Sequence, residues 1–110
     1  MTPNIKSFAN FLKQRDIKKA RELLEQNRGE LNPDDEFTRG YFLALQGMIS
    51  GLEPGGELSV IKQIVNGEYQ QEKIEKLAND LKEKKFRPKD EQGFDTAWLE
   101  ILQEFSGRNE

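Results

Sequence analysis

The sequence predicts an all-α fold, a compact single-domain bundle of about six helices, and three observations indicate it. Apolar residues recur at steps of three and four along most of the chain, which is the period of an α-helix. Capping residues, glycines and prolines separate these segments. The stretch from Asn32 to Leu52 is apolar on nearly every side, which is typical of a buried central helix. We expect one helical domain over residues 1–105 and a frayed C-terminal tail over residues 106–110.

The first two segments are expected to form an N-terminal helical hairpin. Thr2 is placed to cap the first helix, and Asp16 is placed to cap a second helix that runs to about Asn27. The segment DIKKARELL resembles the second helix of a tetratricopeptide-type hairpin through Asp16, Ala20 and Leu24. The resemblance covers one hairpin and lacks the aromatic signature of the first helix, so it indicates a helical hairpin and not membership of that family.

The central helix, residues 32–52, has clear start and stop signals. Asn32 is suited to the N-cap, Pro33 follows it at the first helical position, and Pro54 ends the segment. The positive end of the helix dipole favours carboxylates in the first turn, and this turn holds Asp34, Asp35 and Glu36.

Small residues gather on one side of this helix. On a helical wheel, one arc about 60° wide holds Gly40, Ala44, Gly47 and Gly51. Each glycine inside a helix costs about 1 kcal/mol relative to alanine, so these glycines need a compensating interaction. We expect another helix of the same chain to pack closely against the arc. A self-association face or a ligand slot is the alternative.

The next part of the chain gives a weaker pattern followed by a stronger one. Apolar residues of segment 57–65 have helical spacing, but the Asn66-Gly67 step after it is also typical of a β-hairpin. Residues 57–71 are therefore helix or hairpin, with helix favoured because the apolar residues do not alternate. From about Glu68 to Lys84 the helical pattern is strong. Its narrow apolar seam predicts an outer helix and consists of Ile74, Leu77, Ala78 and Leu81.

The last predicted helix spans residues 94–105, with Asp90 or Asp95 as its cap, after a basic segment that contains Pro88. Its wide apolar stripe consists of Phe94, Ala97, Trp98, Ile101, Leu102 and Phe105. We expect this stripe to close the core of the domain. The alternative is that the helix undocks and lies in a groove of a partner protein.

Composition excludes several kinds of chemistry. The chain has no cysteine, no histidine and a net charge of −3, so it lacks a thiolate nucleophile, an imidazole base and cysteine-ligated metal. The first-turn carboxylates at residues 34–36 are the only dense group that suits a hard cation, and helix capping explains them better. We expect no cofactor, no small-molecule ligand, no membrane span and a cytoplasmic location. A metal-dependent carboxylate enzyme ranks third among the functions.

Two functions rank above an enzyme. The first is a small non-enzymatic binding module that acts through a protein partner or as a homo-oligomer such as a homodimer. Its candidate interface consists of Gly40, Ala44, Gly47, Gly51, Phe94, Trp98, Ile101 and Phe105. The second is a nucleic-acid- or ribosome-associated protein, for which two basic clusters would have to converge along a phosphate backbone. The first cluster consists of Lys13, Arg15, Lys18, Lys19 and Arg21. The second consists of Lys82, Lys84, Lys85, Arg87 and Lys89, with Phe86 placed to stack on an unpaired base.

Overall fold

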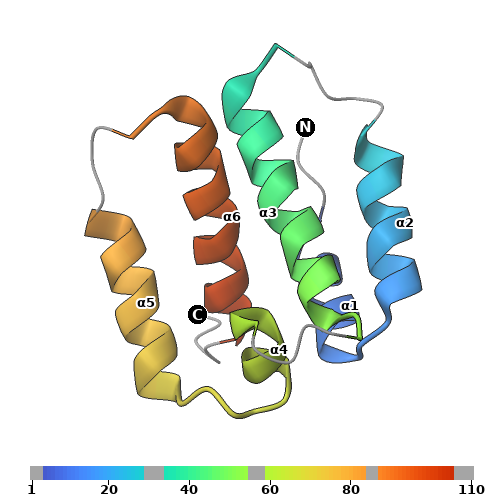
Figure 1. Cartoon of the computed structure of the whole chain (residues 1–110), viewed down its shortest axis with the longest axis vertical. Coiled ribbons are helices and arrows are strands. Elements are labelled where there is room, and N and C mark those ends of the chain that lie inside the picture. The colour runs from blue at the N-terminus through green and yellow to red at the C-terminus, as the bar shows by residue number, and fades with distance from the viewer. Residues whose placement is uncertain (1–3, 29–33, 55–58, 84–86, 106–110) are drawn as a thin grey trace.

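The computed structural model of the protein describes residues 4–28, 34–54, 59–83 and 87–105. These residues form six helices and no strand, so the all-α prediction is confirmed (Figure 1). The helices are α1 (Ile5–Lys13), α2 (Ile17–Arg28), α3 (Glu36–Leu52), α4 (Val60–Val65), α5 (Gln71–Glu83) and α6 (Lys89–Phe105). The radius of gyration of 13.5 Å is close to the value of about 13 Å expected for a compact chain of this length.

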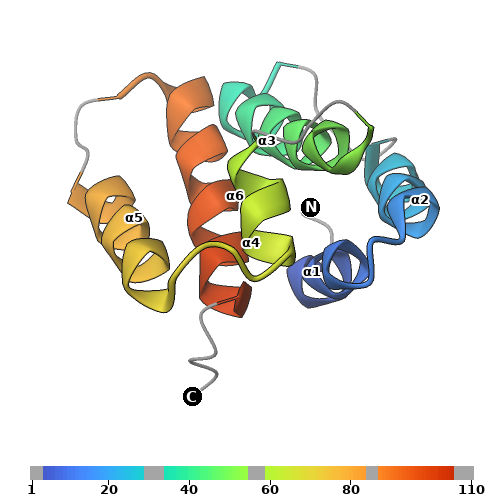
Figure 2. The same cartoon turned by 60° about the horizontal axis from the view of Figure 1, so that its bottom comes forward.

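Helices α3 and α6 form the centre of the bundle and run in the same direction (Figure 1). Parallel neighbours need a connection that returns along the bundle, and α4 and α5 supply it, with α5 antiparallel to α6. Figure 2 shows α1 and α2 on one flank of this central pair and α5 on the opposite flank. The predictions of a central helix and of an N-terminal hairpin, α1 with α2, are therefore confirmed.

Two glycines allow the backbones of α3 and α6 to approach each other closely. A Cβ atom on Gly40 of α3 would lie 1.8 Å from the carbonyl oxygen of Asp90 on α6. A Cβ atom on Gly93 of α6 would lie 1.9 Å from the carbonyl oxygen of Phe37 on α3. These distances are far below a van der Waals contact, so each glycine is required by the backbone of the other helix. The predicted helix crossing on the small-residue arc is confirmed at this end of α3.

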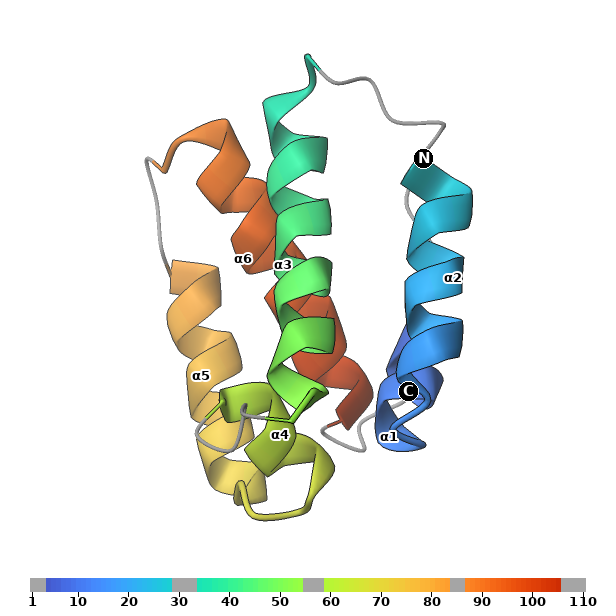
Figure 3. The same cartoon turned by 45° about the vertical axis from the view of Figure 1, so that its right-hand side comes forward.

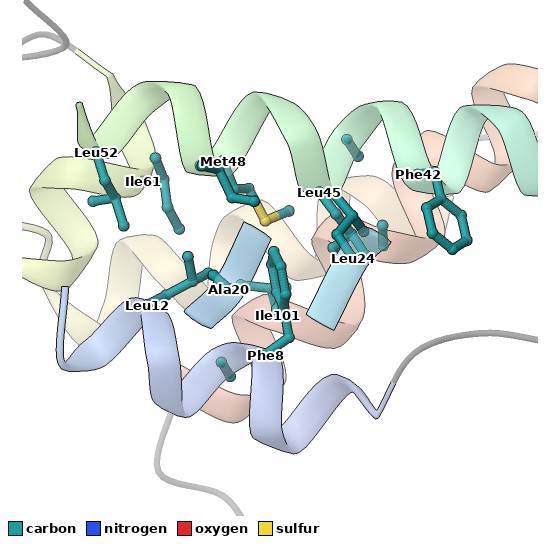
Figure 4. Packing of buried hydrophobic residues seen from close by; sticks show 14 of the residues in the cluster. Phe8, Leu12, Ala20, Leu24, Phe42, Leu45, Met48, Leu52, Ile61 and Ile101 are labelled. Atoms are coloured by element: carbon teal, nitrogen blue, oxygen red, sulfur yellow. The ribbon is translucent and has the colours of Figure 1, made fainter. Parts of the chain in front are cut away.

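The main hydrophobic core lies between α3, α6 and the N-terminal hairpin. In Figure 4, Leu45 and Met48 of α3 point toward Phe8 of α1, and Ile101 of α6 reaches the same space. All of these side chains are almost completely excluded from solvent. Burying a large apolar side chain stabilises a fold by about 1.5–3 kcal/mol, so this cluster holds four helices together.

A second, smaller core joins α4 and α5 to α6. Its buried members are Ile64, Ile74 and Leu102. Trp98 and Phe105 contact both cores, so α6 connects them. On α5, Leu77, Ala78 and Leu81 are partly buried beside Ile74, which agrees with the prediction of an outer helix with a narrow seam.

The helix starts differ from the sequence-based expectations in three places. Helix α1 is capped by Asn4, whose side-chain oxygen accepts hydrogen bonds from the backbone N–H groups of Lys6 and Ser7. The prediction of Thr2 as cap was wrong, because Asn4 offers the same kind of side-chain acceptor two residues later. Asp16 does cap α2, accepting from the N–H of Lys19.

Helix α3 begins at Glu36 with Asp35 at its N-cap, and not at residue 32. Asn32, Pro33 and the Gly29 stop lie outside the described residues. Helix α6 begins at Lys89, because the carbonyl of Pro88 accepts the first helical hydrogen bond from Gln92. Asp90 and Asp95 are therefore inside α6, and neither is its cap.

The segment after residue 57 is a helix and not a hairpin. Ser59 caps α4 by accepting a hydrogen bond from Lys62, and Gly67 follows its C-terminus with a positive φ of 77°. The N–H of Gly67 donates to Ile64 and the N–H of Glu68 donates to Gln63. This pair of bonds is a Schellman motif, in which a glycine in the left-handed region ends a helix. The Asn66-Gly67 step is thus a helix terminus.

Candidate functional site

Most of the predicted interface residues lie inside the fold. Gly40 and Ala44 of α3 and Ile101 of α6 are buried against neighbouring helices of the same chain. Trp98 and Phe105 are partly buried and pack against the core, so the last helix is docked on its own domain. These five residues cannot contact a partner over a large area without unfolding part of the bundle.

Three predicted interface residues have a different environment. Gly51 packs near Ser59 and Ile61 at the start of α4. Phe94 is 37% exposed on α6. Gly47 is exposed, and a Cβ atom placed on it would meet nothing within 4 Å among the described residues. The glycines of the small-residue arc therefore differ: Gly40 contacts α6, Gly51 packs against the start of α4, and Gly47 is open.

The open glycine belongs to an exposed strip along α3. We call this strip the outer face of α3, and it consists of Glu36, Arg39, Leu43, Gly47 and Ser50, all exposed, with Gln46 at its edge. Leu43 is 59% exposed, more than any other large apolar residue that the structure describes. In Figure 3, α3 stands in front of α6 and beside α2, and no described helix covers it from this side.

A groove between α2 and α3 borders the outer face of α3. Its volume is about 260 Å³, and its lining combines Arg21, Leu24, Glu25, Gln46, Ile49 and Ser50. Leu24 and Ile49 belong to the core and give the groove an apolar floor. Arg21 forms an ion pair of 3.0 Å with Glu53, and both side chains remain about half exposed. The groove therefore has a small apolar floor, and polar side chains with charges of both signs form most of its lining.

The structure places the two basic clusters far apart. The first lies around the turn between α1 and α2, and the described members of the second, Lys82, Arg87 and Lys89, lie at the end of α5 and the start of α6, at the opposite end of the molecule in Figure 1. Lys84, Lys85 and Phe86 are outside the described residues. The described residues of the two clusters therefore do not converge on one phosphate-binding surface.

Several of these cations also have partners within the chain. Lys13 donates to the backbone oxygen of Glu104 at 3.1 Å and lies 5.2 Å from the ring centre of Phe105. Arg15 donates to the side chain of Asn66, and Arg21 is paired with Glu53 as described above.

Arg87 contacts two carboxylates of α6, at 2.9 Å on Glu91 and at 3.5 Å on Asp95. The remaining described members of both clusters are solvent-accessible lysines: Lys18, Lys19, Lys82 and Lys89. A surface of four lysines divided between two ends of the molecule is weak support for nucleic-acid binding.

Of the three carboxylates at the start of α3, Asp35 occupies the N-cap, but its side chain makes no capping hydrogen bond to the backbone. The hydroxyl of Thr38 donates to the Asp35 side chain, and this hydrogen bond holds the pKa of Asp35 below its ordinary value. Asp34, Asp35 and Glu36 are all exposed. Within the described residues, no group of three or more acidic side chains is arranged to hold a metal ion.

One buried polar contact joins the central helices. Tyr41 of α3 is 2% exposed, and its hydroxyl donates a hydrogen bond to the carboxylate of Glu100 on α6. Burial, together with the negative charge of Glu100, raises the pKa of Tyr41 far above its ordinary value. The contact satisfies the one polar atom of a large core side chain, which indicates a structural role.

The outer face of α3 is the candidate site that periodicity alone did not reveal. The helix is apolar on most sides of the helical wheel, so the sequence did not show that Leu43, at the edge of the apolar region, meets solvent. The one available signal was the narrow polar stripe of Arg39, Gln46 and Ser50, which borders Leu43 on the wheel.

Comparison with known proteins adds no further assignment. No protein-family model, no curated protein and no solved structure matches this chain. Among the described helices, none combines the length and apolar character needed to cross a membrane. The function is therefore inferred from the residues and their geometry.

Proposed function

We propose that this chain is a small, non-enzymatic binding module of the cytoplasm, and that it binds a protein surface through the outer face of α3. The observation that carries the proposal is Leu43, a large apolar side chain that is 59% exposed on the solvent-facing side of α3. The open position of Gly47, one turn further along α3, supports it.

Leu43 and Gly47 together suit the docking of another helix. Covering an exposed leucine side chain contributes roughly 1.5–3 kcal/mol when the side chain becomes fully buried. A glycine on the same face lets the backbone of the arriving element come close, as Gly40 does for α6. A partner helix would present small or aliphatic side chains at steps of three and four along this strip.

The α2–α3 groove supplies the edges of the proposed site. Its floor at Leu24 and Ile49 can accept an apolar side chain of the partner. Arg21 and Glu53 at its border remain accessible to polar groups. Such a combination of an apolar centre and a polar rim is the usual composition of a protein interface.

Co-purification of partners from source cells tests the proposal. The wild-type chain and the variants Leu43→Glu and Phe94→Glu are tagged, and each sample is divided into nuclease-treated and untreated halves. We expect partners that persist after nuclease treatment, that are lost with Leu43→Glu and that are retained with Phe94→Glu. Phe94→Glu is a matched control, because Phe94 is an exposed apolar residue on α6, away from the proposed face.

Two results would contradict the proposal. Partners that vanish with nuclease would favour the nucleic-acid-associated alternative and would direct attention to Lys18 and Lys19, exposed at the start of α2. Partners that are lost with Phe94→Glu but retained with Leu43→Glu would move the interface from α3 to α6. Circular dichroism of each variant checks that the helices are still formed.

A further inference from the structure

We propose that α5 is a detachable cover of α6. It leaves as a unit while the rest of the bundle stays folded, and the face that it uncovers takes an amphipathic helix of another protein in its place. The inference concerns α6 and goes beyond the proposed site on α3. Two observations carry it: the small contribution of α5 to the interior, and the chemistry of the face that α5 occupies.

Helix α5 contributes little to the interior for its length. It has 13 residues, and Ile74 is the one that is buried in the described structure. Helix α1 has 9 residues and buries three of them, Phe8, Ala9 and Leu12. Among the described residues, no α5 side chain belongs to the main core or packs against it. Figure 2 shows α5 on the flank of α6 away from α1 and α2, so the main core remains complete when α5 leaves.

Helix α4, which precedes α5, is anchored without it. Ile61 of α4 belongs to the main core, and the hydroxyl of Ser59 donates to the backbone oxygen of Gly51 on α3 at 2.9 Å. Between α4 and α5, residues 67–70 lie outside the helices. A short segment of this kind can act as a hinge, because its backbone dihedrals can change without breaking a helix. The opening of α5 is therefore separable from the unfolding of the bundle.

The face beneath α5 is apolar. We call it the α5-binding face, and it consists of Ile64 of α4 with Trp98, Leu102 and Phe105 of α6. Leu102 is completely buried in the closed bundle. When α5 leaves, this face becomes a contiguous exposed apolar patch, and such patches mark sites of protein interaction.

The occupant in the structure defines what the face accepts. The α5 side chains that pack in the second core lie at positions i, i+3, i+4 and i+7: Ile74, Leu77, Ala78 and Leu81. The exposed side of α5 carries charges of both signs, from Glu72, Lys73, Lys76, Asp80 and Lys82. This is the pattern by which amphipathic helices bind apolar grooves of other proteins. The face therefore suits a helix with four aliphatic or small side chains at this spacing and a charged outer side.

The covalent connection favours α5 over a competing helix. A tethered segment has an effective concentration in the millimolar range at its own site. A helix from another protein binds only those molecules in which α5 is open, so its apparent affinity is reduced by that fraction. A substitution that weakens the docking of α5 is therefore expected to strengthen the binding of the competitor.

Ile74→Asp tests whether α5 detaches from a bundle that stays folded. The substitution places a charge at the one buried position of α5. Trp98 is the only tryptophan of the chain and packs on the second core, so its fluorescence reports on the opening. We expect Trp98 emission at longer wavelength, most of the helical circular dichroism retained, and cooperative urea unfolding of the remaining helices. Asn79→Asp, which adds the same side chain at an exposed position of α5, is expected to leave the emission unchanged.

A synthetic peptide with the sequence of residues 70–83 tests the uncovered face. It is added to the full-length Ile74→Asp chain and to the wild type. We expect the peptide to bind the variant and to return Trp98 emission to its wild-type wavelength. Binding to the wild type is expected to be at least about tenfold weaker, because α5 occupies the face in most molecules. A control peptide that carries Ile74→Asp and Leu77→Asp is expected not to bind.

Four results would overturn the inference. Unfolding of the whole bundle by Ile74→Asp would show that the main core depends on α5. A folded Ile74→Asp chain that does not bind the peptide would show that the face accepts no other helix. Equal affinity of the peptide for the variant and the wild type would show that α5 is not its cover. Loss of peptide binding on adding Leu43→Glu to the variant would place the binding on the outer face of α3.

Discussion

At two positions of the central helix pair, only a hydrogen atom fits where other residues carry a Cβ atom. A Cβ atom on Gly40 or Gly93 would lie less than 2 Å from the backbone of the other helix, whereas Gly47 faces open space. These three helical glycines therefore divide into two that the crossing of α3 and α6 requires and one that the fold does not use.

Substitution of these glycines by alanine separates the two groups. Gly40→Ala or Gly93→Ala forces the helix backbones apart and is expected to lower the free energy of unfolding by about 3 kcal/mol. Gly47→Ala adds helix propensity without a contact and is expected to raise the free energy of unfolding by up to about 1 kcal/mol. Urea denaturation of the three variants measures both effects. Equal effects at all three positions would contradict the close crossing.

Tyr41 makes the free energy of unfolding depend on pH in alkaline solution. Its pKa in the folded chain is raised above the ordinary value of 10.0, first by burial and then by Glu100. A group whose folded pKa is raised contributes stability that is complete below its unfolded pKa and is lost as the pH rises above it. The free energy of unfolding of the wild type is therefore expected to fall above about pH 10.

Tyr41→Phe removes both the hydrogen bond to Glu100 and this titration. At neutral pH the variant is expected to be less stable than the wild type by about 1 kcal/mol, the usual net value of one hydrogen bond. Above the pKa of tyrosine in the unfolded chain, the difference in free energy of unfolding between the wild type and the variant is expected to shrink. The wild type loses the contribution of Tyr41 as the pH rises, whereas the phenylalanine variant has no such contribution to lose. Tyr69→Phe, at a half-buried position outside the helices, is the control. A difference that stays constant with pH would show that Tyr41 does not titrate differently in the folded state.

At the scale of elements, sequence patterns located the helices better than their ends. The narrow seam of α5 and the cap of α2 at Asp16 follow directly from spacing and capping preference. The start of α6 was missed because its first turn is polar and Gly93, which resembles a loop residue, is used for the contact with α3. The hairpin alternative at Asn66-Gly67 arose because glycine with positive φ serves helix ends and hairpin turns alike.

The packing of α5 predicts that it is the least protected of the longer helices. Ile74 is the one α5 residue that is fully buried in the described structure, and α5 joins the bundle chiefly through α6. Few buried apolar contacts permit local opening at low free-energy cost. Amide hydrogen exchange is therefore expected to be faster throughout α5 than in α3 and α6.

Ile74→Ala tests the same point. It is expected to accelerate exchange in α5 further while leaving the exchange of α3 nearly unchanged. Exchange in α5 as slow as that in α3 would contradict this account of the second core.

At the scale of the whole molecule, the candidate site could be predicted only in part. The sequence indicated a small-residue arc on α3 and a wide stripe on α6, but not which of these residues the fold itself covers. The structure assigns Gly40, Ala44 and Ile101 to the interior and leaves Gly47 outside beside Leu43. The packing of several helices decides this exposure, so the periodicity of a single helix could not show it.

The charge distribution, too, could be predicted only in part from the sequence. Two basic clusters that are separated in sequence were predicted to form one surface if they converged, yet the bundle places their described residues at opposite ends. The two clusters are separated because α3 and α6 are parallel. Helix α5 therefore carries the chain back along the molecule, and the second cluster begins only near its C-terminal end. The outer face of α3 is left as the surface with the clearest apolar character.

The inner side of α3 holds the fold together, and we propose that its outer face binds a protein partner or a second copy. The most direct test is the midpoint of urea unfolding as a function of protein concentration, for the wild type and for Leu43→Lys. Self-association through this face would stabilise the folded state by mass action and raise the wild-type midpoint with concentration, whereas a face used only for another protein leaves the midpoint unchanged. The Leu43→Lys midpoint is expected to be independent of concentration, with a stability within about 0.5 kcal/mol of the dilute wild type. A Leu43→Lys variant that is strongly destabilised even when dilute would contradict this division of α3, because Leu43 would then be needed by the fold.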